Sequence, residues 1–297
     1  MGHSFAPSWI GKPGDVFGLG LGTALLASAL VNVGAALQAL EARTTPQRLG
    51  LRLPLLVALA KRWRWLLGLS LALIAVAPQV LAFATAPFVV VQTALTAGLL
   101  LLLRLGVVML DEGVRISAWI GVLAIVSGAA LVSWGAPAHN ETHRGGFVVI
   151  GVVAALVAGS LAPWAVRGSR LDSSLLLIIA SGIGFAGANV TTKLMSDDAQ
   201  SAHWPIAIAW AVLGLAMGVA ATLTGMTAFQ RRSASVVVPL STTVQTFLPI
   251  LLAPLFLREA LSSAQFVGMP ILAGLGAAFV GTILVVRTEG VSRLAAA

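Results

Sequence analysis

Charged residues are scarce in this sequence. Of its 297 residues, 9% are Asp, Glu, Lys or Arg, whereas 58% are hydrophobic. A soluble domain of average composition carries about 25% charged residues. A chain of this length cannot enclose so much apolar surface in a water-soluble core, so the surplus must face lipid. The composition therefore excludes an ordinary soluble fold and predicts a polytopic, all-α membrane protein.

Cysteine is absent, which excludes disulfides, thiolate metal sites and a cysteine nucleophile. The motif His-Glu-x-x-His does not occur, and no carboxylate lies deep in any long apolar run. The four histidines fall outside these runs, and the cluster 139–143 is interpreted as a solvated loop. We therefore expect neither an enzyme, nor a cofactor, nor a metal site.

Nine apolar runs are long enough to cross a bilayer, because a hydrocarbon core of about 30 Å requires roughly 20 helical residues. A shorter run, 53–60, stands between Arg52 and Lys61. It is interpreted as an interfacial helix, with a half-inserted element as the alternative. The nine predicted spans are 16–40, 65–86, 88–110, 116–134, 146–166, 173–195, 204–225, 236–257 and 264–286.

The basic residues fall mainly on one side of this pattern. The minority side holds only Lys12, Arg144, Lys193 and Arg258. The positive-inside rule then places the N-terminus outside and the C-terminus in the cytoplasm. This distribution accounts for most of the net charge of +8, so no nucleic-acid partner is expected. The other fourteen are Arg43, Arg48, Arg52, Lys61, Arg62, Arg64, Arg104, Arg115, Arg167, Arg170, Arg231, Arg232, Arg287 and Arg293.

The chain also contains a weak internal repeat. The segments 89–91 and 236–238 are both Val-Val-Val, and the same spacing of 147 positions pairs Thr96 with Thr243 and Glu112 with Glu259. The pair Asn-Val occurs at 32–33 and again at 189–190. We infer a first repeat over 1–135 with a basic cytoplasmic loop at 41–64, a connecting span over 136–171, and a second repeat over 172–297. Because an odd number of spans separates the repeats, the second is inverted, as is typical of secondary transporters.

Each repeat ends in an apolar span, an acidic tip and a glycine-bearing closing span. The tips read Leu-Asp-Glu-Gly-Val at 110–114 and Leu-Arg-Glu-Ala-Leu at 257–261. This order resembles the drug/metabolite transporter superfamily of EamA-like proteins. The Gly-Leu-Gly-Leu stretch at 18–21 and Ala-Thr-Ala-Pro at 84–87 are most similar to its NIPA-like branch, which is linked to magnesium transport. The resemblance implies a multi-pass transporter of the plasma (cytoplasmic or inner) membrane.

The sequence departs from that family at two acidic positions. The NIPA-like pattern carries a glutamate in the second span, where this chain has Ala-Val-Ala-Pro-Gln at 75–79. Small multidrug transporters of the superfamily use a glutamate in their first span, and none lies between Asp15 and Glu41 here. Both magnesium transport and proton antiport through a carboxylate are therefore disfavoured. Glu112 and Glu259 are interpreted as caps at the start of the helix that follows each of them.

Polar side chains inside a bilayer are costly unless they are paired or face a cavity, so those in the spans are candidate substrate contacts. Hydrogen bonding between packed helices is the alternative for all of them, and snorkelling to the outer interface is the alternative for the lysine. Pro78 predicts a kink in the second span. The candidates are Asn32, Gln79, Gln92, Thr96, Asn189, Lys193, Thr243 and Gln245.

We expect a secondary transporter that moves a small metabolite or an amphiphile by alternating access. A NIPA-like Mg²⁺ pathway and a flippase or accessory subunit for lipid-linked material are the alternatives. The expected partners are the lipid bilayer and a small-molecule or amphiphilic substrate. Both a monomer and a homodimer remain open.

The predicted topology can be tested on single-cysteine variants, since the natural chain has no cysteine to interfere. Cysteines introduced at Gln47 and at His143 should react with a membrane-impermeant maleimide added from opposite sides of sealed vesicles. Labelling of both positions from the same side would exclude the nine-span topology.

Overall fold

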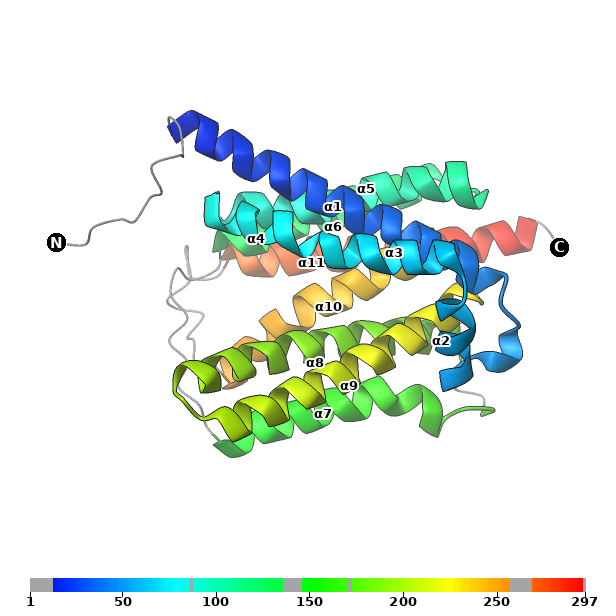
Figure 1. The fold of residues 1–297 in the computed structure, drawn as a ribbon. Coiled ribbons are helices and arrows are strands. Elements are labelled where there is room, and N and C mark those ends of the chain that lie inside the picture. Colours follow the sequence, from blue (N-terminus) through cyan, green and yellow to red (C-terminus); the bar gives the residue numbers. More distant parts are fainter. Residues whose placement is uncertain (1–12, 86–87, 136–145, 170–172, 257–268, 296–297) are drawn as a thin grey trace.

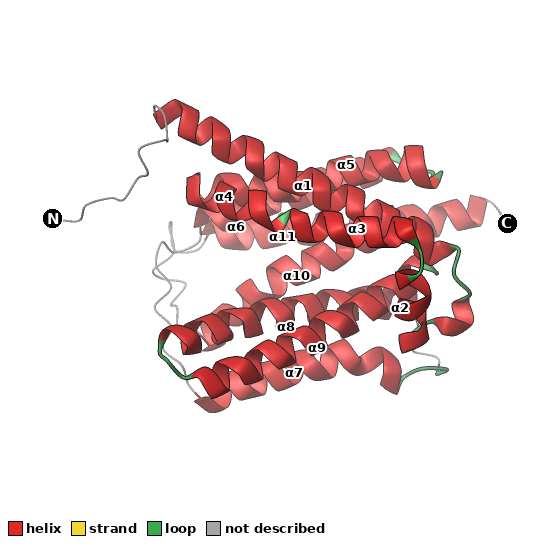
Figure 2. Ribbon diagram, viewed as in Figure 1, coloured by secondary structure: helices red, strands yellow, loops and turns green. Residues whose placement is uncertain are grey.

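The computed structural model describes residues 13–85, 88–135, 146–169, 173–256 and 269–295, and every regular element in these ranges is a helix (Figures 1 and 2). The elements are α1 (Pro13–Arg43), η1 (Gln47–Leu49), α2 (Leu53–Ala60), α3 (Trp63–Ile74), α4 (Val76–Thr85), α5 (Phe88–Leu110), α6 (Ile116–Gly135), α7 (Gly146–Ala165), α8 (Ser174–Gln200), α9 (Trp204–Phe229), α10 (Ala234–Phe256) and α11 (Met269–Ala295).

Seven helices of the described chain are long and apolar enough to cross a membrane: α1, α5, α6, α7, α8, α9 and α11. A shorter apolar stretch covers Trp63–Gln79 in α3 and α4. The protein is therefore a helical, multi-pass membrane protein. The count of nine spans also requires α10 and the α3–α4 pair to cross, and it stays a prediction.

The second predicted span is divided into α3 and α4. Proline lacks an N–H and its ring clashes with the carbonyl four residues earlier, which weakens a helix at that point. For Pro78 that carbonyl belongs to Ile74, the last residue of α3, and α4 begins at Val76. The interruption predicted from Pro78 is thus present. By contrast α10 runs as a single helix although it contains three prolines.

The two halves of the chain pack in a similar order. In the first half α1 lies against α3, α4 and α5, and in the second half α8 lies against α9 and α10. In addition α5 packs on α6, and α10 packs on α11 (Figure 1). Helix α7, which corresponds to the fifth predicted span, lies against α8 and α9. Each half therefore has one central helix surrounded by the next elements of its own half.

Helices α6 and α11 make the closest helix-to-helix approach between the halves. A Cβ atom built on Gly128 would lie 2.5 Å from the Gly274 carbonyl oxygen, and one built on Gly121 would lie 2.6 Å from that of Gly281. Residue numbers rise along one helix as they fall along the other, so the pair is antiparallel. Only glycine permits backbones to approach this closely, as in other membrane helix pairs.

The buried core is continuous at one end of the bundle and divided at the other. We call the end with the continuous core the basic end. Helix α1 ends there, and α2 lies there beside α3 and α9 (Figure 1). Its single cluster takes buried residues from α1, α2, α3, α5, α6, α8, α9, α10 and α11. Towards the far end three separate clusters replace it, one in α1, α4 and α5, one in α7, α8 and α9, and one in α6, α10 and α11.

The glycine contact predicts different effects for two substitutions in α11. Gly274→Ala places a methyl group against the backbone of α6 and should cost about 1–3 kcal/mol through overpacking. Gly276 has open space around it, so Gly276→Ala should be neutral or gain up to about 1 kcal/mol of helix propensity. Apparent melting temperatures of the two variants in detergent, measured against wild type, check this. Equal melting temperatures would show that the α6–α11 approach does not limit stability.

Candidate functional site

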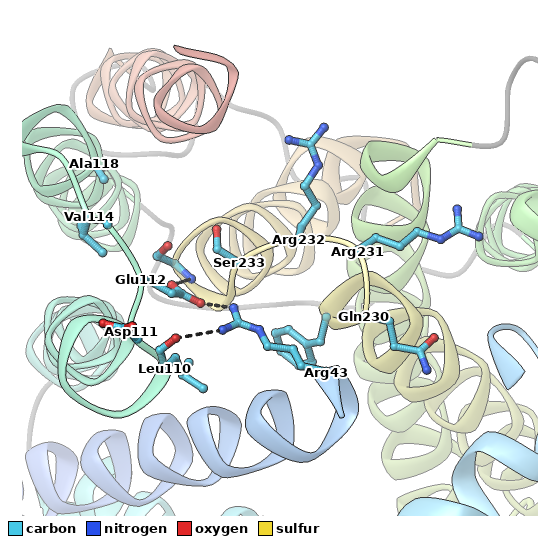
Figure 3. Close-up of a pocket in the computed structure, with 13 residues that line it drawn as sticks. Arg43, Leu110, Asp111, Glu112, Val114, Ala118, Gln230, Arg231, Arg232 and Ser233 are labelled. Atoms are coloured by element: carbon cyan, nitrogen blue, oxygen red, sulfur yellow. Dashed lines mark hydrogen bonds and ion pairs between the residues drawn. The ribbon is translucent and has the colours of Figure 1, made fainter. Parts of the chain in front are cut away.

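The candidate site is a buried carboxylate at the basic end. Glu112 lies in the loop between α5 and α6, and its side chain is only 6% exposed. One oxygen, Oε1, accepts a hydrogen bond from the Ala234 N–H at 2.7 Å, and Oε2 accepts one from the Ser235 N–H at 3.0 Å. The carboxylate also forms an ion pair with the Arg43 guanidinium (Figure 3). A single side chain thus joins α1, the α5–α6 loop and α10.

Local backbone geometry directs Glu112 into this position. Asp111 has a positive φ of 53°, the left-handed conformation that Asp tolerates better than most residues. The chain therefore reverses after α5, and the Glu112 N–H donates to the Gly106 carbonyl at 2.9 Å. A Cβ atom on Gly106 would lie 2.9 Å from Glu112 Oε2, so a side chain at position 106 would force the carboxylate to shift.

The electrostatics explain why a carboxylate can be buried here. The first N–H groups of a helix have no intrahelical acceptor and carry partial positive charge. Ala234 and Ser235 begin α10, and they supply two of these donors. Arg43 supplies a full positive charge from the last turn of α1 and also donates to the Leu110 carbonyl at 3.4 Å. Without such donors, the burial of a carboxylate would cost several kcal/mol.

The interpretation of Glu112 as a helix cap needs one correction. The carboxylate does cap a helix, but the helix is α10 and not the following helix, α6, which starts at Ile116. The left-handed turn at Asp111 is the physical reason, because it turns Glu112 back over α5 and towards the other half. Glu259 lies outside the described residues.

A cavity of about 370 Å³ adjoins this carboxylate. It lies between the α5–α6 loop and the turn that joins α9 to α10, and Arg43 borders it (Figure 3). Arg231 and Arg232 also border the cavity, but both side chains point away from Glu112 (Figure 3). Arg232 donates through Nε to the Ser174 hydroxyl at 2.7 Å. The cavity is therefore a polar space at the seam between the two halves.

The two predicted asparagines lie in different surroundings. Asn32 is 5% exposed, and its Nδ2 donates to the Ser28 carbonyl within α1 at 2.8 Å. It sits where α1 closely approaches Gly98 of α5. Asn189 is exposed on α8, and α1 and α8 do not form a packed pair in the described structure. The structure does not bring these two amides together, and their roles in binding stay predictions.

The other candidates fall mainly on α5 and α10, which pack against each other. Thr96 of α5 is buried, with 6% exposure. Thr243 and Gln245 of α10 are half-buried, and the Thr243 hydroxyl donates to the Pro239 carbonyl of its own helix at 2.8 Å. Gln79 is half-buried on α4. The side chains of Gln92 and Lys193 lie outside the described part of the structure.

Comparison of the chain with protein-family models, with curated proteins and with solved structures gives no match. The functional argument therefore rests on the sequence and on the geometry described above.

Sequence reasoning did not find the partners of Glu112. Arg43 is 69 positions away and the α10 N-terminus more than 120, so no local spacing connects them. In the sequence, nothing distinguishes Arg43 from the other basic residues on the predicted cytoplasmic side, or Gly106 from the other glycines among the 31. An acid at the exit of an apolar span, following a glycine by six positions, is the one available signal.

Glu112→Gln should lower the stability of the basic end. The amide loses the ion pair with Arg43 and offers one acceptor oxygen in place of two, which should cost about 1–3 kcal/mol. Asp111→Asn is the matched control, because Asp111 is exposed and Asn tolerates its left-handed backbone. Thermal unfolding in detergent should show a lower melting temperature for Glu112→Gln only. Equal shifts for both variants would show that loop charge, and not the cap, determines stability.

Proposed function

We propose that this protein is a secondary transporter of the drug/metabolite type, which moves a small metabolite or an amphiphile by alternating access. The observation that carries the proposal is the asymmetry of the core. Nine helices share one buried cluster at the basic end, whereas the cores towards the far end are separate. A bundle held together at one end and divided at the other has the form expected of a transporter closed on one side of the membrane.

The closed side is assigned to the cytoplasm. Arg43, Arg231 and Arg232 border the same cavity, and the positive-inside rule assigns such arginine-rich ends to the cytoplasm. In this orientation the Glu112 contacts form part of the cytoplasmic closure, and the divided end faces the outside. The substrate would enter from the divided end in the conformation described here.

An inverted repeat is supported by matching contacts in the two halves. In the first half, α1 meets α3 at Gly34 and Gly68, where a Cβ atom on Gly34 would lie 2.5 Å from the Gly68 carbonyl oxygen. The equivalent helices α8 and α9 meet at Thr191 and Gly214, where a Cβ atom on Gly214 would lie 2.6 Å from the threonine Oγ1. Asn32 and Asn189 have the same sequence offset, 157, as Gly34 and Thr191. Repeats of this kind place a substrate site where the halves meet.

Substrate recognition would rest on hydroxyl and amide groups. The polar residues Thr96, Thr243 and Gln245 lie on α5 and α10, which come from different halves and contact each other. Mg²⁺ prefers carboxylate and other oxygen ligands in near-octahedral geometry. The predicted spans carry no deep carboxylate, which disfavours Mg²⁺ relative to an organic substrate.

Side-specific labelling tests the proposed conformation. In otherwise cysteine-free protein, Gln245→Cys should react with an impermeant maleimide from outside, because Gln245 lies on the half-buried face of α10. Ser235→Cys should be protected from the cytoplasmic side, because Ser235 is 7% exposed beside Glu112. A transported solute should lower the first rate and raise the second. Protection of Gln245→Cys from both sides would exclude a water-filled path.

Uptake into proteoliposomes then identifies the solute. Compounds that raise the melting temperature of the purified protein are tested as radiolabelled substrates, with Mg²⁺ and a fluorescent lipid as the competing classes. Gln245→Ala should lower uptake of the true solute by one to two orders of magnitude, because a lost buried hydrogen bond costs about 1–3 kcal/mol. Uptake of Mg²⁺ alone, or scrambling of lipid alone, would overturn the proposal.

A further inference from the structure

The segment that joins α1 to α3 has no equivalent in the second half. We call residues 44–60 the strap; they contain η1 and α2. In the second half α8 ends at Gln200 and α9 starts at Trp204, so only three residues connect the equivalent helices. The strap is therefore an addition to one half only, and it lies at the basic end.

The middle of the strap is bound to the other half of the protein. The Leu51 N–H donates to the Thr227 hydroxyl of α9 at 3.0 Å, and the Leu51 carbonyl accepts from the Trp164 indole N–H of α7 at 2.9 Å. The Gln230 amide, just after α9, donates to the carbonyls of Thr45 and Pro46 at 3.2 and 3.3 Å. These bonds connect the strap to α9 of the second half and to the connecting helix α7, which packs against α8 and α9.

The ends of the strap are attached to the first half. Arg62, just after the strap, donates to Glu41 Oε2 of α1 at 2.9 Å and also bonds the Thr44 hydroxyl. The Thr45 hydroxyl donates to the Glu41 carbonyl at 3.0 Å. The start and the end of the strap are thus attached to the first half, while its start and Leu51 are also bound to α7, α9 and Gln230. The strap therefore spans the seam that must open on this side.

The strap holds strain at the residue that the second half contacts. Leu51 has a positive φ of 56°, which is rare and unfavourable for a leucine. Its backbone N–H and carbonyl are bound by α9 and α7. The residue is 4% exposed and belongs to the shared core, the single buried cluster of the basic end. A strained residue persists where its surroundings determine it, so withdrawal of α7 and α9 would let Leu51 relax. At Leu51, therefore, the hydrogen bonds favour the attached strap and the backbone strain favours its release.

We propose that the strap is a built-in lock that keeps the cytoplasmic side closed at rest, and that its release from α7 and α9 precedes opening. This inference rests on the proposed transport function. Leu55 and Leu59 of α2 are fully buried in the shared core and add to the closed state. The polar bonds around Leu51 are the releasable part, because water can replace each of them once α7 and α9 withdraw. In this proposal the strap does not contact the substrate; it determines how often the cytoplasmic side opens.

The test compares two buried threonines of α9 that have different hydrogen-bond partners. Thr227→Val removes the acceptor of the Leu51 N–H, whereas the buried Thr224 hydroxyl has its hydrogen bonds to Ala220 and Ala221 within α9. Each change is made in protein carrying Ser235→Cys, and cytoplasmic labelling by an impermeant maleimide is measured in inside-out vesicles. Thr227→Val should raise the labelling rate about tenfold, and Thr224→Val should leave it unchanged.

Two further variants separate the possible results. Trp164→Phe removes the donor to the Leu51 carbonyl while keeping an aromatic ring, and it should also raise labelling. Glu112→Gln should raise labelling through the other contact that closes this side. If Glu112→Gln opens the site but Thr227→Val and Trp164→Phe match Thr224→Val, the lock is wrong and the transport proposal stands. If none of the variants raises labelling, the lock is overturned and the basic end is not a gate. Size-exclusion profiles of each variant confirm that the protein is folded.

Discussion

A carboxylate that leaves water needs hydrogen-bond donors for both of its oxygens, and at Glu112 these donors come from three separate parts of the chain. This requirement determines how the basic end is assembled. The α10 N-terminus must reach the α5–α6 loop, and α1 must end beside both, or the buried charge costs several kcal/mol. The shared core forms around the same junction. Its apolar packing adds stability to the directional hydrogen bonds and ion pair of Glu112. Closure at this end is therefore both specific and strong.

The far end is stabilised differently, by separate buried clusters. Each of its clusters belongs to one group of helices, so the groups are stabilised separately there. Contacts across the bundle include those of α5 with α10 and of α6 with α11, the pairs that the proposed repeat relates. One continuous cluster at the basic end and separate clusters at the far end fit a protein in which one end changes its contacts more easily than the other. In the proposed transporter, the residues for recognition and those for closure then occupy different levels of the same helices.

Much of the helical pattern could be predicted from sequence because lipid imposes a length and a composition on each span. The bounds of α5 agree with the predicted span, and the interruption near Pro78 follows from the missing N–H. For the strap, the sequence predicts only a basic loop with an interfacial helix, because the hydrogen bonds of the strap join residues more than 110 positions apart. The partner of Glu112 was assigned to the wrong helix for a related reason, since one left-handed residue redirected the side chain. Local patterns predict elements; they do not predict which distant elements meet.

The glycine contact between α6 and α11 has a mechanical consequence. The two helices touch through backbone atoms at Gly128 and Gly274, and the side chains of Val132 and Ala278 pack around this contact. Close-packed side chains resist a change in the angle between two helices, because each must shift or change rotamer. The α6–α11 pair is therefore a rigid link: it fixes the distance between the two halves and resists rotation of one against the other at this contact.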